Sequence, residues 1–354
     1  ITGRLNVDQT INRMLKAGIN STFSQIKYHD VPLGNERQDN SALIYSAMTF
    51  IPTVPVYEED GVTFAGPVGG MSDRQNPLRE LYDNRDNHLD YWRLFGNGYV
   101  ELKPVKGLVI RSNFGIDHYS SFINAMTKTF HSDIVNNDIA KTTLSHNSET
   151  NWTWSNTANY NFRLADKHDF TVLLGTEMSK QSVIDFSAYS EEYTLEDKDY
   201  MWPNAATGTM RNSGAKVGYR LASFFGKVDY NFDDFILASF TIRRDGSSRF
   251  GKDNRWGTFP AATLGVRLSK LLQKDWMDDW KIRASWGQLG NQNIGLYPYQ
   301  AMIAGVSNYP FDKKTETVGY QQKAYANRDI KWETTTITDV GVDLQVFNGL
   351  NVTF

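Results

Sequence analysis

The sequence contains no cysteine, which excludes disulfide frameworks, thiolate nucleophiles and cysteine metal sites together. It also lacks any run of about eighteen consecutive apolar residues, so a membrane-spanning helix is excluded. A clear excess of one charge is missing too, because 37 basic and 40 acidic residues give a formal net charge of −3. This balance gives no indication of a nucleic-acid partner.

The bulk composition is that of an ordinary, rather polar soluble protein. Hydrophobic residues make up 40% of the 354 positions, and the mean hydropathy is −0.49. A transmembrane β-barrel has the same bulk composition, because it turns every second residue toward a wet lumen. Aromatic residues reach 13%, which fits the interfacial girdles of a barrel or the cross-strand pairs of a soluble β-sandwich. Composition leaves both folds open.

Alternation of apolar and polar residues with a period of two recurs along the chain and predicts β-strands with two different faces. The sequence WKIRASWGQ from Trp280 alternates in this way, and so do residues 151–164 and the stretch that follows Trp332. Similar patterns occupy residues 92–102, 108–116, 170–178, 224–232, 236–242 and 260–268. We count about twelve such strands, many longer than the roughly 9–11 residues that a tilted strand needs to cross a bilayer.

The connections between these strands alternate in length. Short segments rich in turn formers occur at residues 7–10, 103–107, 165–168 and 231–234. Long connections lie between them, roughly at residues 28–89, 121–147, 186–216, 244–255 and 290–330. Outer-membrane barrels place tight turns at the periplasmic end and large loops at the extracellular end, whereas a sandwich has no reason to do so. The pattern predicts an all-β, antiparallel transmembrane barrel.

Three separated stretches carry a more specific signal. Residues 242–268 read IRRDGSSRFGKDNRWGTFPAATLGVRL, residues 281–295 read KIRASWGQLGNQNIG, and the third stretch, from Ala324, reads AYANRDIKWETTT. Together they resemble the SusC/RagA-type family of TonB-dependent outer-membrane transporters. The resemblance gives a structural role to Arg244, Asp245, Gly246, Ser247, Ser248, Arg249, Phe250, Gly251, Gly290, Asn291, Gln292, Trp332 and Glu333.

This resemblance implies a barrel of about 22 strands that is filled by a plug domain. It also implies energy delivered by a TonB complex, a SusD-like surface lipoprotein as partner, and oligosaccharides or peptides as substrates. The location would be the lipid bilayer of a Gram-negative outer membrane, with no cofactor and no catalysis. We expect residues 1–354 to be a partial barrel domain, about half of the wall, without the plug domain, the TonB box or the C-terminal strands.

The Asp245-Gly246-Ser247-Ser248 segment could suggest a catalytic serine or a phosphate-binding loop. A turn at the tip of a strand pair is the favoured interpretation, because neither a G-x-S-x-G elbow nor a partner histidine is present. We expect Arg243, Arg244 and Arg249 around this turn to pair with loop carboxylates. Residues 287–290, with the sequence GQLG, end a strand and open no helix, so a nucleotide loop is not favoured either. The sequence predicts no catalytic residue.

A metal site is also not predicted. The acidic residues between Glu191 and Asp199 could bind calcium but lack the D-x-D-x-D-G spacing, so a solvated loop is favoured. The histidines are scattered without metal-ligand spacing, at His29, His88, His118, His131, His146 and His168.

Aromatic residues in the long connections are the best candidates for substrate binding, because exposed rings suit sugars and peptide side chains. They are Tyr200, Trp202, Tyr297 and Tyr299. The alternative is that these rings pack the loops together. We expect inward polar residues to contact the plug or line the pathway, among them Arg163, Lys227, Asp229, Lys281, Arg283 and Glu333. Two other functions stay open, namely a passive porin and a soluble carbohydrate-binding β-protein.

Overall fold

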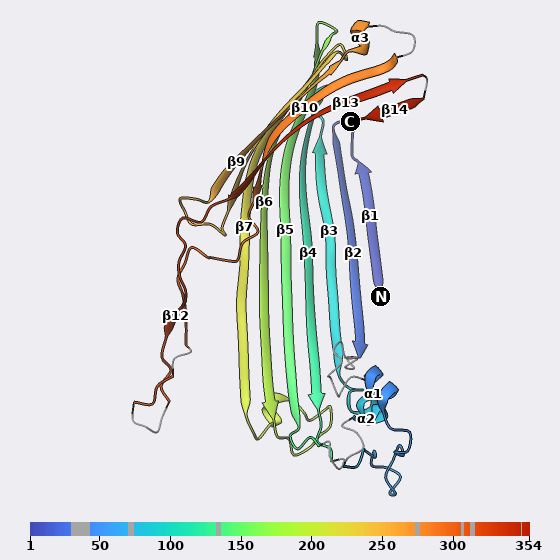
Figure 1. Ribbon diagram of the computed structural model, residues 1–354, viewed down its shortest axis with the longest axis vertical. Helices are drawn as coiled ribbons and strands as arrows, with labels where there is room; N and C mark the ends of the chain where they lie inside the picture. The colour runs from blue at the N-terminus through green and yellow to red at the C-terminus, as the bar shows by residue number, and fades with distance from the viewer. Residues whose placement is uncertain are drawn as a thin grey trace.

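The computed structural model describes residues 1–29, 43–69, 74–131, 136–272, 277–305, 308–311, 316–347 and 349–354. A single antiparallel sheet of 12 strands dominates the fold, and each strand pairs with its neighbour in the chain (Figure 1). Its strands are β1 (Thr2–Thr10), β2 (Leu15–His29), β3 (His88–Leu102), β4 (Leu108–Thr127), β5 (Lys141–Leu164), β6 (His168–Glu191), β7 (Met210–Phe232), β8 (Ile236–Ser247), β9 (Trp256–Arg267), β10 (Met277–Asn291), β13 (Glu333–Val346) and β14 (Leu350–Thr353).

The remaining elements are short and lie in the connections. A separate two-stranded sheet pairs β11 (Met302–Ala304) with β12 (Gln321–Ala324). The helices are α1 (Leu43–Thr49), α2 (Pro77–Asp83), α3 (Ser269–Leu272) and the 3-10 helix η1 (Pro203–Ala205). Within the described ranges, none of the helices has the length and apolar character that crossing a membrane requires.

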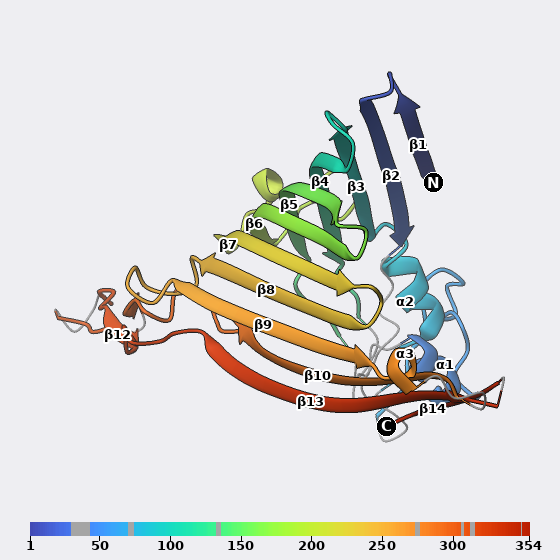
Figure 2. The same ribbon diagram turned by 90° about the horizontal axis from the view of Figure 1, so that it is seen from above.

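The large sheet bends into an open arc, as the view from above shows (Figure 2). Its strands run side by side, and α1 and α2 lie at the end where the long connections gather (Figure 1). Twelve antiparallel strands joined in chain order confirm the predicted fold class, a part of a larger barrel wall.

The two faces of the sheet differ sharply in chemistry. Trp154 lies opposite Phe114 on β4 and Met178 on β6, and all three belong to the even-numbered positions. The neighbouring odd position, Ser155, lies opposite Glu177 on β6. From β3 to β13 the even-numbered positions therefore form what we call the outward face, and the odd-numbered positions form the polar face. The alternation predicted from the sequence is the cause.

Side chains on the polar face reach across intervening strands, as expected on the concave side of a curved sheet. The Tyr99 hydroxyl on β3 donates to Asp8 on β1, and Gly18 on β2 leaves the space between them. Arg243 Nη2 on β8 similarly reaches Glu177 Oε1 on β6 at 3.1 Å, across β7. The six polar residues predicted to point inward all occupy this face: Arg163, Lys227, Asp229, Lys281, Arg283 and Glu333.

The strands extend further than the sequence predicts. The connections expected at residues 121–147 and 186–216 are too wide, because β4 continues to Thr127 and β6 continues to Glu191. In the β4 extension both faces carry a mixture of apolar and polar residues, since Phe122 and Asn124 share one face while Ser121 and Ile123 share the other. Alternation disappears here because parts of the extended strands are covered by the connections, as Asn124 and Met126 are, while the backbone ladder continues.

One predicted turn is misplaced. Residues 7–10 belong to β1, and the chain reverses between Ile11 and Met14 instead. The Asn12 Oδ1 atom accepts hydrogen bonds from the backbone N–H groups of Met14 at 2.8 Å and Leu15 at 2.9 Å. Asn12 stabilises the turn because its side chain bonds to the backbone two residues later. Asp8 forms no such turn, because it lies inside the paired strand β1.

Candidate functional site: the loop rim and the polar face

The motif residues from the three separated stretches meet in one small aromatic core, which we call the motif junction. Phe250 is completely buried and its ring lies 5.2 Å from that of Trp332. The Phe259 ring lies 5.4 Å from Trp332 on another side. The Trp332 indole Nε1 donates to the carbonyl of Arg255 at 2.9 Å, which ties the stretch before β13 to the β8–β9 hairpin.

Glycines of the motifs make room for these rings. A Cβ added at Gly290 would overlap the Phe259 ring, and one at Gly246 would lie 2.8 Å from the indole of Trp256. Gly251 similarly lies against Tyr299. Gly246 sits inside β8, so the predicted turn over residues 245–248 is wrong; the chain leaves the strand only after Ser247. A glycine opposite a large ring in a strand pair explains the Asp-Gly sequence better than a turn does.

The three arginines around this hairpin have different partners. Arg243 forms ion pairs with Asp245 at 2.8 Å and with Glu177 at 3.1 Å, and both carboxylates belong to strands. The guanidinium of Arg244 instead lies over the Trp256 ring, 5.5 Å from its centroid. The predicted pairing with loop carboxylates is therefore wrong for Arg244, which pairs with Thr258 and reaches the indole one step further along β9.

Arg249 also departs from that prediction. Its guanidinium lies 4.3 Å from the centroid of the Tyr219 ring and donates to the carbonyl of Ile294. The Ser247 hydroxyl accepts from the Arg249 N–H at 3.1 Å, which shapes the hairpin. The predicted carboxylate partner is wrong here as well, because the hairpin carries the side chain onto β7 and the connection after β10.

Other motif residues form hydrogen bonds at the ends of strands. The Ser248 N–H donates to the Arg220 carbonyl at 3.0 Å, and its hydroxyl accepts from the Arg220 N–H at 2.9 Å. At the neighbouring strand end, Asn291 Nδ2 donates to Glu333 Oε2 at 2.8 Å, joining β10 to β13. The Gln292 Oε1 atom is buried and has no hydrogen-bond partner among the described residues.

The polar face contains networks of paired groups. Glu149 accepts hydrogen bonds from Gln181 at 2.6 Å, Asn151 at 2.7 Å and the Tyr119 hydroxyl at 2.9 Å. Near the short-turn end, Lys281 pairs with Asp343 at 3.0 Å. Within the described ranges, no three His, Asp or Glu side chains lie close enough to hold a metal ion. Such a surface can bind and guide polar solutes.

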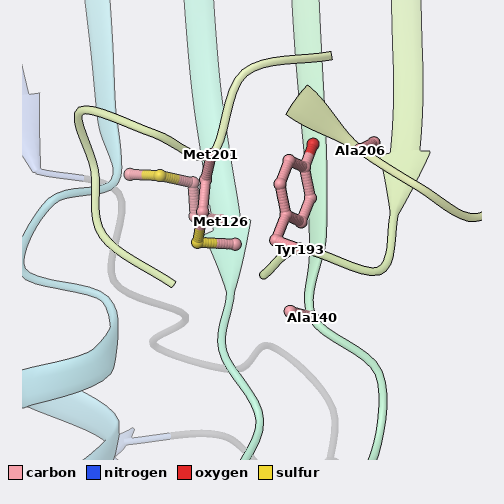
Figure 3. Close-up of a cluster of buried hydrophobic side chains, with 5 residues drawn as sticks. All are labelled: Met126, Ala140, Tyr193, Met201 and Ala206. Carbon is pink, nitrogen blue, oxygen red and sulfur yellow. The ribbon is translucent and has the colours of Figure 1, made fainter. Parts of the chain in front are cut away.

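A hydrophobic cluster anchors the connection between β6 and β7 (Figure 3). Met201 is its least exposed member at 1%, and the Thr142 hydroxyl donates to the Met201 carbonyl at 3.1 Å. The flanking side chains consequently point to solvent, with Tyr200 57% and Trp202 41% exposed. The cluster consists of Met126, Ala140, Tyr193, Met201 and Ala206.

The acidic segment before this cluster bonds to the protein itself. Both oxygens of Glu196 accept hydrogen bonds at 2.6 Å, one from the Thr129 N–H and the other from its hydroxyl. Asp197 accepts from the Asp199 N–H at 3.0 Å. These bonds fasten the connection after β6 to the one after β4.

The first long connection is held by a buried arginine on α2. Arg79 Nη1 donates to Asp83 at 3.3 Å and Nη2 donates to Glu80 at 3.1 Å, while the guanidinium lies 3.3 Å from the centroid of the Phe130 ring. Burial lowers the pKa of Arg79 and raises the pKa of Asp83. Asn76 caps the helix by accepting from the Leu78 N–H at 3.0 Å.

The remaining aromatic candidates lie in a different place from Tyr200 and Trp202. The Tyr297 hydroxyl donates to the Gly218 carbonyl of β7 at 2.7 Å, and the Tyr299 ring lies 6.4 Å from that of Tyr297. Both rings line a groove beside outward positions of β6 and β7. Sequence reasoning missed Phe259 and Arg255, whose only sequence signal is the placement of glycines near them.

Known proteins resemble this chain in sequence and in fold. The family described as TonB dependent receptor-like, beta-barrel matches residues 35–354. The chain is 30% identical over 373 residues to the TonB-dependent receptor SusC of Bacteroides thetaiotaomicron, covering 95% of this chain and 34% of that protein. A TonB-dependent receptor of Formosa agariphila is 26% identical over 368 residues, covering 98% of this chain and 34% of its own length.

The fold itself recurs in a solved structure, that of the RagAB peptide transporter, with a TM-score of 0.79 at 23% identity. This match covers 98% of the present chain and 38% of the other. The chain spans about a third of the length of the curated relatives it matches. The sheet, its two faces, the motif junction and these matches agree: the chain belongs to the TonB dependent receptor-like β-barrel family and is of the SusC/RagA type.

Proposed function

We propose that this chain forms part of the wall of an outer-membrane importer for oligosaccharides or peptides. The importer is energised through a TonB complex and works with a SusD-like surface lipoprotein. The contrast between the faces carries the proposal: an apolar band on the outward face suits lipid, and a paired polar face suits an aqueous pathway. We further propose that residues 1–354 contribute a partial barrel, with the plug domain and TonB box supplied by sequence outside this stretch.

Deletion of the gene that encodes the chain tests this function. We expect the deletion strain to lose growth on one class of glycan or peptide and to regain it on complementation. Deletion of TonB should remove the same growth, because the importer depends on transmitted energy. Normal growth of the deletion strain on every glycan and peptide supplied would contradict the proposal.

Single-channel conductance separates the importer from a passive porin. A plugged barrel stays nearly closed in a planar bilayer, whereas a porin conducts steadily. We expect the complete protein to remain closed. Steady conductance of the purified protein would favour the porin.

We also propose that Tyr200 and Trp202 contact the substrate, because the anchored Met201 between them holds both rings in solvent. Replacing both rings by alanine should lower the affinity for substrate by about tenfold, since each aromatic contact contributes roughly 0.5–1.5 kcal/mol. Tyr325→Ala is the matched control, because this tyrosine is 90% exposed in another connection. Equal losses in both variants would remove these residues from the site.

A further inference from the structure

A groove of about 820 Å³ lies beside β6 and β7, on the loop side of the last residue of β8. The pairing of β7 with β8 ends at Leu221 and Ser247, whereas its pairing with β6 continues to Met210. Strands β6 and β7 contribute most of its lining, including the outward positions Lys180, Lys216 and Arg220, and Tyr297 and Tyr299 complete it. The space falls within the range of ligand sites, about 300–1,000 Å³.

The groove is strongly positive. Lys180, Lys216, Arg220 and Arg255 line it, and no acidic residue does among the described positions. None of these four side chains forms an ion pair with a described carboxylate. Lys180 and Arg220 lie directly opposite each other across the β6–β7 pair, and such like charges repel unless an anion lies between them.

Arg255 adds an independent observation. Its Nε atom is buried and has no hydrogen-bond partner among the described residues. A buried guanidinium N–H without an acceptor is costly, so the site lacks an acceptor that a bound anion would provide.

The strand cations that line the groove lie on the outward side of the sheet. From β3 to β9 the outward positions contain one acidic residue, Asp90, and it already pairs with Lys27 of β2 at 3.6 Å. Most cations on the polar face, by contrast, face carboxylates, as Arg243 faces Glu177. A solute on the polar face would lie on the other side of the sheet from Lys180 and Arg220, so the position of these cations favours a ligand on the lipid side.

The depth of the groove agrees with a lipid headgroup. Trp152 lies directly opposite Lys180, and Trp154 and Met178 follow one step toward the short turns. Trp256 lines the groove from β9. Indole rings gather where the hydrocarbon of a membrane meets water. Lys180 and Arg220 lie at the level of Trp152 and one step on the loop side of Trp154, which places them near the headgroup phosphates.

From these observations we propose that the groove binds a phosphorylated glycolipid of the membrane leaflet on the loop side. Lys180 and Arg220 bind the phosphate, and Lys216 and Arg255 add positive charge beside it. The Tyr297 ring contacts the headgroup sugar. Basic pockets at this depth bind anionic lipid headgroups in other membrane proteins. The inference rests on the outer-membrane location within the proposed function and goes beyond import.

The test measures binding of diphosphoryl lipid A to the complete transporter in detergent by native mass spectrometry. In the double variant Lys180→Gln/Arg220→Gln we expect binding about thirtyfold weaker, because each cation near an anionic headgroup contributes roughly fivefold. Lys216→Gln alone should weaken it about fivefold. Lys27→Gln is the matched control, since this outward lysine already has a carboxylate partner, and it should leave binding unchanged.

Two further ligands identify the source of the anion. Dephosphorylated lipid A should bind the unaltered protein as weakly as diphosphoryl lipid A binds the double variant. Inorganic phosphate at millimolar concentration should not displace lipid A. Equal lipid A binding by the double variant and the unaltered protein overturns the proposal, and so does displacement by free phosphate. This experiment measures lipid binding and not import. If the deletion test contradicted the proposed import function, the lipid-binding result could therefore still be interpreted.

Discussion

The lack of a side chain at Gly290 allows the rings of the motif junction to pack together. A Cβ at this position would overlap the Phe259 ring, which packs against Trp332. We expect Gly290→Ala to destabilise the protein by about 1–3 kcal/mol, because overpacking forces buried rings off their preferred rotamers. Thermal unfolding in detergent, followed by circular dichroism, should show the lower midpoint.

Gly295→Ala is the matched control for that variant. A Cβ at Gly295 would meet no atom within 4 Å, so its midpoint should stay unchanged. If both glycine variants unfold at the same temperature, the close packing of Phe259 is not what requires glycine at position 290.

Ala165 occupies a left-handed backbone conformation with φ of 48° in the turn between β5 and β6, and Asp166 follows at 53°. Left-handed residues other than glycine, asparagine and aspartate are strained by about 1–2 kcal/mol. Ala165→Asn should therefore stabilise the protein by roughly 0.5–1 kcal/mol, measured as a higher unfolding midpoint. Asp166→Asn should change little, because aspartate already tolerates this conformation. A lower midpoint for Ala165→Asn would contradict the assigned turn.

The motif residues could be recognised from the sequence, but their contacts could not. The sequence predicts that Arg244 and Arg249 pair with carboxylates, since charge is the property it displays. In the fold both guanidinium groups lie over aromatic rings, those of Trp256 and Tyr219. Which ring a cation meets depends on the register of strands far apart in the sequence, and one residue of slip would move it to the other face.

At the scale of whole elements, alternation predicted the strands well where the two faces meet different surroundings. It failed where the connections cover the extended strands, and the ladder from Ser121 to Thr127 was expected to be a connection. The groove cations carry a readable signal, because Lys180, Lys216 and Arg220 fall in phase with the apolar positions of their strands. Arg255 carries none, since only the hairpin brings it there.

Helix α2 depends on one buried charge. The Arg79 side chain is 6% exposed, and Arg79→Met would deprive Glu80 and Asp83 of their guanidinium partner. Removing one member of a buried ion pair costs about 3–5 kcal/mol, so the segment should open locally far more often. We expect chymotrypsin to cleave residues 43–87 at least about a hundredfold faster than in the unaltered protein.

Arg85→Met provides the comparison for α2. This arginine is also close to a carboxylate, that of Asp86 at 3.8 Å, but its side chain is 41% exposed. Exposed pairs contribute about 0–1 kcal/mol, so cleavage should accelerate less than tenfold. Equal acceleration in the two variants would show that burial of Arg79 is not what secures the helix.

The whole molecule is a curved sheet whose two faces differ in charge. Acidic residues and their partners lie on the polar face, as Asp343 does with Lys281, and unpaired cations lie on the outward face. The period-two pattern predicted a polar and an apolar face, and it did not predict the unpaired cations on the outward face. Curvature adds what the pattern lacks, because it brings side chains such as Tyr99 and Asp8 together across a strand.

The large sheet has an open edge at β1. β1 pairs only with β2, and all of its residues are exposed. Ile1 exchanges two hydrogen bonds of 2.8 Å with Gln25, so the odd residues bond to β2 and the N–H of Asn6 points to the free edge.

Such an edge is a template for pairing between chains, so chain 1–354 in detergent should self-associate. Asn6→Pro removes an outward donor and should shift sedimentation toward the monomer while β-structure is kept, because proline is tolerated at an edge. Leu5→Pro removes a bond to Ser21 instead and should disorder β1. Identical sedimentation of Asn6→Pro and the unaltered chain would mean that association does not proceed through this edge.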